Sequence, residues 1–195
     1  MKHKTESAFF AWRSAALYFL LLCLPSLSRA ADIQAPGVPN FWKVDDQVYR
    51  GAQPSEAGFQ SLAKLGVKTV VDLRLAGEES HSKAEEQRIV EAAGMKYVSV
   101  PMEGMHTPAN DQVSRVLSIL QDPAAGPVFL HCQRGADRTG ALIACYRIGH
   151  DGWQNKKALD EARSLGMSWY QVALRRYVLG YRVAPPSNPI AVAAR

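Results

Sequence analysis

The segment HCQRGADRTG, residues 131–140, constrains the fold of this 195-residue chain more than any other part of its sequence. The residues before it, Pro127 to Leu130, are all apolar and are typical of a short buried strand. The apolar residues 141–146 after it are typical of the start of a buried helix. A glycine-containing turn between a strand and a helix directs backbone N–H groups into one concavity, at the positive end of the helix dipole. The segment therefore predicts an oxyanion-binding loop.

The side chains of this loop suit a nucleophile that attacks phosphorus. A helix N-terminus and a nearby cation favour the thiolate, so we expect Cys132 to be ionised at neutral pH and to act as the nucleophile. The guanidinium of Arg138 can bind two phosphate oxygens and balance charge in the transition state. Thr139 can donate a hydrogen bond to the sulfur, and Gly135 allows the tight turn that phosphate needs. The expected phosphate-binding residues are Gln133, Arg134, Gly135, Ala136, Asp137 and Arg138.

The segment resembles the signature loop of the cysteine-dependent protein tyrosine phosphatase superfamily, His-Cys-x5-Arg-Ser/Thr-Gly. It is most similar to the compact bacterial branch that resembles dual-specificity phosphatases. Segments 48–54 (VYRGAQP) and 69–74 (TVVDLR) are also similar to that branch, and the resemblance covers roughly residues 41–179. The resemblance implies two steps, in which a phosphocysteine forms on Cys132 and water then hydrolyses it. It also implies that no metal or other cofactor is required.

The N-terminus has the pattern of a secretory signal peptide. Residues 1–4 carry positive charge, residues 15–24 are apolar (AALYFLLLCL), and Ser28 and Ala30 are small residues before a cleavage site. We therefore expect cleavage after Ala30 and a periplasmic or secreted protein. The apolar run is shorter than the roughly 20 residues that span a membrane, so we expect no span after signal removal. An uncleaved segment that anchors the protein in the membrane is the alternative.

The net charge of the chain limits the classes of partner that we expect it to bind. Residues 1–30 hold +3 of the net charge of +5, which leaves +2 for the rest of the chain. This remainder has no basic cluster and no zinc-finger spacing, so we expect no nucleic-acid partner. Its length of about 165 residues suits one domain. We expect a monomer whose partner is a phosphorylated protein or a small phosphomonoester.

Two cysteines remain after cleavage, Cys132 and Cys145. An even number in an exported protein is compatible with a disulfide. Cys145, however, would lie about 9 Å along the helix that follows the loop, whereas bridged Cα atoms lie within roughly 7 Å of each other. We therefore expect Cys145 to be a buried apolar residue. A reserve thiol that protects Cys132 from over-oxidation is the alternative.

Strand and helix patterns alternate along the chain. This alternation predicts a single α/β domain with a mainly parallel central sheet and helices on both faces. The expected strands are 44–50, 68–73, 96–102 and 128–131. The expected helices are 55–65, 82–93, 107–121 with Thr107 as its cap, 139–150, 155–165 and 169–180. The expected organisation is a signal peptide at 1–30, a linker at 31–40, the phosphatase domain at 41–182 and a flexible tail at 183–195.

A phosphatase of this type also needs an acid that protonates the leaving group. The resemblance places it in the loop 100–108 (VPMEGMHTP), where this chain has Gly104 at the position of the usual aspartate and Glu103 beside it. Asp137 is the preferred candidate, because an aspartate directly before the loop arginine also occurs in myotubularin-like lipid phosphatases. Glu103 is the second. The remaining candidates are His106 and Asp111.

Three further residues are expected to support the loop. Asp72 and Arg74 would support it through an ion pair or a hydrogen-bond network, and His131 would hydrogen-bond to neighbouring backbone. Arg50 and Gln53 would line the mouth of the pocket or form a turn.

The favoured function is that of a protein tyrosine or dual-specificity phosphatase. A phosphoinositide or inositol phosphate phosphatase is an alternative. Lipid-directed relatives often carry lysine where this chain has Ala136, but the charge of Arg134 could meet a second phosphate. A rhodanese-type sulfurtransferase and a phospho-ligand binding module without turnover are the remaining alternatives.

Overall fold

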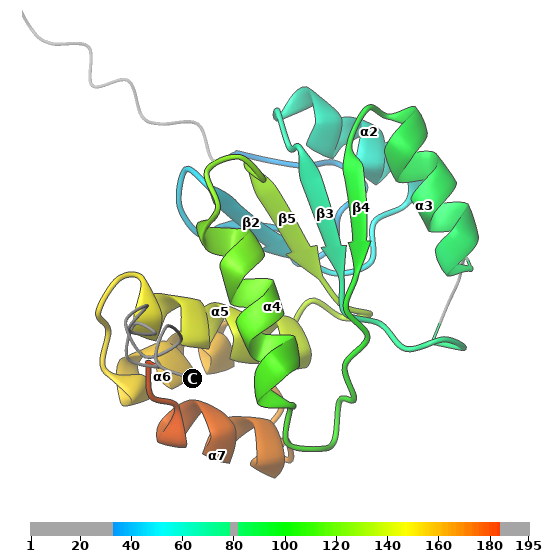
Figure 1. Ribbon diagram of the computed structural model, residues 1–195. Coiled ribbons are helices and arrows are strands. Elements are labelled where there is room, and N and C mark those ends of the chain that lie inside the picture. The colour runs from blue at the N-terminus through cyan, green and yellow to red at the C-terminus, as the bar shows by residue number, and fades with distance from the viewer. Residues whose placement is uncertain (1–32, 79–81, 184–195) are drawn as a thin grey trace, which may run out of the picture. The chain divides into compact units, whose positions relative to one another are not determined.

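A five-stranded sheet organises the computed structural model, which describes residues 33–78 and 82–183 (Figure 1). The strands are β1 (Trp42–Lys43), β2 (Val48–Gly51), β3 (Thr69–Asp72), β4 (Lys96–Ser99) and β5 (Val128–His131). Their order in the sheet is β1-β2-β5-β3-β4, and only the pairing of β1 with β2 is antiparallel among these strands. The predicted α/β fold with a mainly parallel sheet is confirmed.

The central position of β5 brings three strand ends to one level. His131 at the end of β5 pairs with Gly51 of β2 on one side and with Asp72 of β3 on the other. Every residue of β2, β3 and β5 is buried, as in parallel sheets that are covered on both faces. The chain that leaves β5 therefore emerges between the ends of two other strands.

Helices cover both faces of the sheet (Figure 1). Their bounds are α2 (Glu56–Lys64), α3 (Lys83–Ala92), α4 (Asn110–Gln121), α5 (Asp137–Gly149), α6 (Asn155–Ser164) and α7 (Val172–Gly180). On one face, Phe59 of α2 and Val90 of α3 share a hydrophobic cluster with Val70 and Phe129 of the sheet. On the other face, α5 is buried along nearly its whole length and contacts α4, α6 and α7. This burial fixes the start of α5 against the end of β5.

Several element boundaries differ from those that the sequence predicts. The expected strand 44–50 begins only at Val48, because the carboxylate of Asp45 accepts hydrogen bonds from the N–H groups of Gln47 and Val48 and makes a turn there. The short strand β1 before that turn was not expected. Helix α5 begins two residues earlier than predicted, and α7 begins three residues later.

The predicted cap at Thr107 is wrong. Helix α4 begins at Asn110, and its N-cap is Ala109. The side-chain oxygen of Gln112 accepts a hydrogen bond from the N–H of Ala109 at 3.2 Å. A glutamine at this position satisfies the helix start, so the threonine hydroxyl is not used there.

The second half of the expected linker 31–40 packs onto the domain. Ala35 and Val38 are buried. The hydroxyl of Ser61 donates to the carbonyl oxygen of Pro36 at 2.8 Å, and the N–H of Ser55 donates to that of Gly37. The domain therefore extends N-terminally of residue 41. The expected signal peptide and tail residues 184–195 lie outside the described residues.

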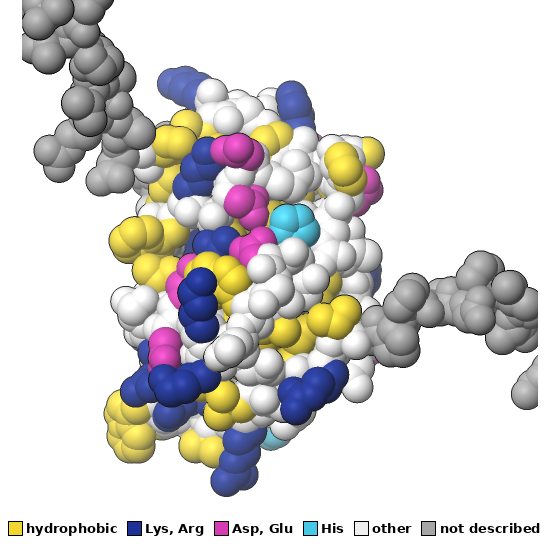
Figure 2. Space-filling model, turned by 90° about the vertical axis from the view of Figure 1, so that its left-hand side faces the viewer, with side chains coloured by type: hydrophobic (Ala, Val, Ile, Leu, Met, Phe, Trp, Pro, Cys, Tyr) yellow, Lys and Arg dark blue, Asp and Glu magenta, His cyan; other side chains and the backbone are white. Residues whose placement is uncertain are grey.

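Two features of the described residues concern possible partners: the distribution of charge on the surface and the length of the helices. On the face that lies at the left of Figure 1, basic side chains are scattered among acidic and apolar ones (Figure 2). Within residues 33–78 and 82–183, no helix is long and apolar enough to cross a membrane.

Candidate active site

The chain passes from β5 to α5 through the loop 132–136 at the carboxyl end of β5 (Figure 1). Cys132 follows β5 directly and is 2% exposed. Helix α5 begins at Asp137 with Ala136 as its N-cap, and the N–H of Gly140 donates to the carbonyl of Ala136. The first turn of a helix leaves its N–H groups without acceptors in the helix. These groups are therefore available to an anion beside the sulfur, as the sequence predicts.

A buried arginine of β2 holds this loop in place. Arg50 is 0% exposed, and its Nη2 donates to the carbonyl of Gly135 at 2.6 Å. Gly135 has φ +66°, and a Cβ there would lie 2.3 Å from the carbonyl carbon of Gly51. Only glycine fits this position. The expectation that Arg50 lines the pocket mouth or a turn is wrong, because Arg50 supports the loop from inside the protein.

The charge of Arg50 has no carboxylate partner among the described residues. Its Nε and Nη1 atoms are buried without a hydrogen-bond partner in that part of the chain. Burial lowers the pKa of Arg50 to about 10, and a negative charge on Cys132 acts against that fall. A negative charge on Cys132 therefore stabilises the guanidinium of Arg50.

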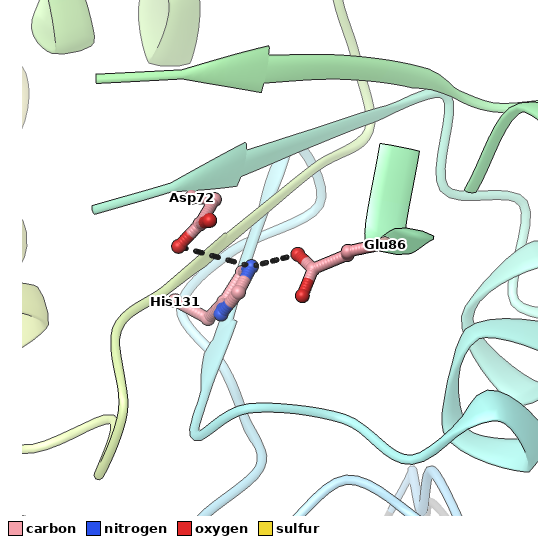
Figure 3. Close-up of side chains that lie close together, drawn as sticks. All are labelled: Asp72, Glu86 and His131. Atoms are coloured by element: carbon pink, nitrogen blue, oxygen red, sulfur yellow. Dashed lines mark ion pairs between the residues drawn. The ribbon is translucent and has the colours of Figure 1, made fainter. Parts of the chain in front are cut away.

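A second set of buried charges lies beside the strand ends. Figure 3 shows three of its members, Asp72 of β3, Glu86 of α3 and His131 of β5, and the fourth is Arg74, which follows β3. Arg74 donates from Nε to Asp72 at 2.9 Å and from Nη2 to Glu86 at 2.5 Å. The Nε2 atom of His131 lies 3.0 Å from Oε1 of Glu86 and 3.9 Å from Oδ1 of Asp72. All four side chains are 0% exposed. The predicted ion pair of Asp72 and Arg74 is confirmed, whereas His131 faces carboxylates rather than backbone.

The sequence does not predict a role for Glu86. The one signal in the sequence is its position, because Glu86 is an acidic residue on the same face of α3 as Ile89 and Val90. A glutamate on the apolar face of a helix needs a buried partner, and here it has Arg74 and His131.

Asp72, Glu86 and His131 have the donor atoms of a metal site and lie close together. Protein donors already occupy the two carboxylates. Besides Arg74, the hydroxyl of Tyr97 donates to Asp72 at 2.8 Å and the amide of Gln53 donates to Glu86 at 2.6 Å. A cation there would have to displace the guanidinium, so this cluster fits a structural ion network better than a metal centre.

Loops that follow β3 and β4 hold Arg138. Its Nη1 donates to the carboxylate of Glu78 at 2.6 Å and to the carbonyl oxygens of Met102 at 3.1 Å and Leu73 at 3.4 Å. These bonds all use Nη1, which leaves Nε and Nη2 for a phosphate. The sequence did not predict Glu78, which stands in an irregular loop without a periodic pattern.

Comparison with known proteins identifies the family. The family model described as DSP-PTPase phosphatase fused to NAD+ kinase matches residues 34–177. The chain belongs to this phosphatase family. The dual specificity protein phosphatase TpbA of Pseudomonas aeruginosa (strain UCBPP-PA14) is 33% identical over 146 residues, which cover 73% of this chain and 60% of TpbA. The inositol diphosphatase DSP3 of Arabidopsis thaliana is 30% identical over 157 residues, covering 78% of this chain and 74% of DSP3.

Solved structures agree with this family. The core catalytic domain of the PP-IP phosphatase SIW14 from Saccharomyces cerevisiae, in complex with citrate, has a TM-score of 0.67 at 26% identity and covers 76% of this chain and 89% of that chain. A structure of TpbA in complex with pTyr has a TM-score of 0.61 at 28% identity and covers 75% and 91%.

The two preferred acid candidates of this phosphatase have different surroundings. Asp137 is 8% exposed, and its carboxylate accepts from the N–H of Ser168 at 2.7 Å and from Arg134 at 3.2 Å. The side chain of Glu103 is 61% exposed and lies 2.5 Å from the imidazole of His106. Glu103 is on the loop whose Met102 carbonyl contacts Arg138. Asp111 lies in the exposed first turn of α4.

The hydroxyl of Thr139 and the thiol of Cys145 differ in the chemical roles open to them. Thr139 is 0% exposed, and its hydroxyl has no hydrogen-bond partner within the described residues, so it is available to the Cys132 sulfur. Cys145 is a free, buried thiol, which confirms that it does not pair with Cys132. Burial raises the pKa of Cys145 to about 12. Such a thiol stays protonated and is a poor reserve nucleophile.

The close approach at Gly135 can be tested by adding a single methyl group. Gly135→Ala should reduce the free energy of unfolding by about 1–2 kcal/mol for the left-handed backbone and by a further 1–3 kcal/mol, roughly, for overpacking. Gly94→Ala is the matched control, because its φ is +80° with nothing within 4 Å of the added Cβ. Urea unfolding measures both. Equal losses would contradict the contact with β2.

The buried ion network should give stability that depends on pH. Burial acts to raise the pKa of Asp72, but the charge of His131 and the hydrogen bonds from Arg74 together outweigh it, and the pKa lies below its ordinary value. The carboxylate therefore stabilises the fold above the unfolded pKa of about 3.9, and this contribution is lost as the pH falls through the folded pKa.

Asp72→Asn tests this network. It should lower the free energy of unfolding at pH 7 by about 3–5 kcal/mol, because it leaves Arg74 incompletely paired. It should also weaken the loss of stability in acid. Glu56→Gln, an exposed change in α2, should cost less than about 1 kcal/mol. If urea unfolding finds the two variants equally stable at pH 7, the network does not contribute to the free energy of unfolding.

Proposed function

We propose that this chain hydrolyses phosphomonoesters through a phosphocysteine on Cys132, as a protein tyrosine or dual-specificity phosphatase. One observation carries the proposal: Cys132 stands between the end of β5 and the first turn of α5, and Arg138 is held in that first turn. Membership of the family and the similarity to TpbA support it. The chain spans about 60% of the length of TpbA, so the activity of the whole protein is part of the proposal.

The proposed reaction has two displacements at phosphorus. The N–H groups of the loop and the Nε and Nη2 atoms of Arg138 bind the phosphate oxygens. The sulfur of Cys132 then forms the S–P bond while the bond to the substrate oxygen breaks, and an acid gives that oxygen a proton. Water next attacks phosphorus and loses a proton to the same carboxylate. The S–P bond breaks, and a hydrogen bond from Thr139 stabilises the departing thiolate.

We infer that the acid is Glu103 rather than Asp137, which the sequence favours. Both oxygens of Asp137 are engaged, one with the N–H of Ser168 and the other with Arg134. This arrangement suits a structural tie between α5 and the segment before α7. Glu103 is exposed, and the loop that carries it reaches Arg138 through the carbonyl of Met102. A small movement of this loop would bring its carboxyl group to a bound substrate.

An inositol phosphate phosphatase is the second candidate. The inositol diphosphatase DSP3 and the PP-IP phosphatase SIW14 are relatives, and Arg134, whose side chain is 56% exposed, offers a cation beside the loop. Release of phosphate from an inositol diphosphate faster than from phosphotyrosine would favour it. Formation of thiocyanate from thiosulfate and cyanide would instead support the rhodanese-type alternative, and binding without turnover the non-catalytic module.

We also propose that residues 1–30 direct export to the periplasm or the medium. The order of charged, apolar and small residues supports this. N-terminal sequencing of the exported protein should begin at Ala31. A sequence that begins at Met1 on a membrane-bound protein would support the anchored alternative.

Replacement of the nucleophile tests the activity itself. Cys132→Ser should reduce phosphate release from p-nitrophenyl phosphate by at least about 1,000-fold, and a chelator should leave the wild-type rate unchanged. Cys145→Ala is the control, because it removes the other described cysteine and should keep the rate. Turnover that survives in Cys132→Ser would show that another group is the nucleophile.

The choice of acid is tested with leaving groups of different quality. Glu103→Gln should slow hydrolysis of phosphotyrosine by about 100-fold and of p-nitrophenyl phosphate much less, because only the poorer leaving group needs the proton. The fall in rate at high pH should disappear in this variant. Asp137→Asn should affect both substrates equally through the loop. The opposite pattern, measured as kcat over a pH series, would make Asp137 the acid.

A further inference from the structure

An exposed apolar surface lies beside the candidate active site. Trp169 and Tyr170 precede α7, Val172 begins it, and Met105 stands in the loop that carries Glu103. Their exposed fractions are 81%, 45%, 48% and 59%. Half of the eight exposed large apolar side chains in the described residues are in this group. Exposed apolar side chains that gather in one place mark binding surfaces, whereas scattered ones do not.

A groove of about 570 Å³ lies within this surface, and Met105, Tyr170, Val172, Arg176 and Tyr177 are among its lining residues. The amide of Gln171 lies 3.4 Å from the sulfur of Met105, which ties the start of α7 to the Glu103 loop. The groove is therefore built from segments about 65 residues apart in the chain, and one of them is the loop that would deliver the acid.

The groove is connected to the phosphate-binding loop through Arg134. The Nη1 atom of Arg134 lies 3.2 Å from the hydroxyl of Ser168 and 3.5 Å from that of Tyr170. The N–H of Ser168 also donates to Asp137 at the start of α5. A ligand whose phosphate lies against Cys132 would thus extend over Tyr170 into the groove.

The charge of this surface is positive. Arg176 is exposed and has no ion pair within residues 33–78 and 82–183. Arg175 donates to the carbonyl oxygen of Trp169 at 2.7 Å and has no carboxylate partner within the same residues. Its Nε is a buried donor without a partner there. Arg175 and Arg176 therefore favour an acidic ligand, and the exposed rings of Trp169 and Tyr170 favour one that also has apolar side chains.

We propose that this aromatic–arginine surface, Met105, Trp169, Tyr170, Val172 and Arg176, binds the polypeptide that flanks a phosphotyrosine in a protein substrate. The inference rests on the proposed phosphatase function and names its substrate class. The flanking segment carries acidic and apolar side chains: carboxylates meet Arg176, and apolar groups cover the aromatic rings. Trp, Tyr and Arg are the residues that most often dominate such interfaces. A small inositol phosphate would use the arginine charge but leave the apolar side chains uncovered.

The test compares two substrates of the full-length protein. One is p-nitrophenyl phosphate, which fills only the phosphate loop. The other is a phosphotyrosyl peptide with glutamates and leucines on both sides of the phosphotyrosine. Trp169→Ala and Arg176→Glu should each reduce kcat/KM for the peptide by about 10-fold or more, mainly through KM, while kcat/KM for p-nitrophenyl phosphate stays unchanged. Leu179→Ala and Arg88→Glu change exposed residues elsewhere, on α7 and α3, and should affect neither substrate.

A charge swap makes the test specific. A peptide with lysines in place of the glutamates should be a poor substrate of the wild type and a better one of Arg176→Glu. Equal losses on both substrates, or none on the peptide, would overturn the inference while leaving the phosphatase intact. So would a loss in Arg176→Glu confined to an inositol polyphosphate. No hydrolysis of p-nitrophenyl phosphate by the wild type would instead overturn the proposed function, and the inference with it.

Discussion

A single buried guanidinium, that of Arg50, holds the phosphate-binding loop in place. Arg50 is fully buried, yet it bonds to the carbonyl of Gly135 rather than to a carboxylate. A buried cation without an anion is costly, and a negative charge on Cys132 acts against the fall that burial causes in the pKa of Arg50. We propose that the arginine which fixes the geometry of the loop also favours the thiolate of Cys132.

The second buried arginine, Arg74, differs from Arg50 in its partners. Arg74 is paired with Asp72 and Glu86, and Glu86 also faces His131. This network balances its charges within the protein and connects β3, α3 and the end of β5. It can stabilise the strand ends beneath the loop without a negative charge on Cys132. Arg74 thus stabilises the fold, whereas Arg50 supports the loop that carries the nucleophile.

The sequence predicts the parts of this site that depend on local pattern. The change from an apolar strand to a glycine-containing loop and a helix places Cys132, Gly135 and Arg138 correctly, because neighbours along the chain determine that geometry. The parts that depend on distant contacts were not predicted. Arg50 acts on a residue 85 positions away, and no periodicity reveals that contact. Glu78 and Glu86 likewise find their partners only when the loops and helices pack together.

The charge balance between Arg50 and Cys132 is best tested by the alkylation rate of Cys132 as a function of pH. The reagent is iodoacetate, the background is Cys145→Ala, and the comparison is with Arg50→Met, which keeps an apolar side chain in the same space. The account predicts a rate that is nearly constant between about pH 6 and pH 8 with Arg50 present, and one that falls steeply toward low pH in Arg50→Met. Identical profiles in the two proteins would contradict it.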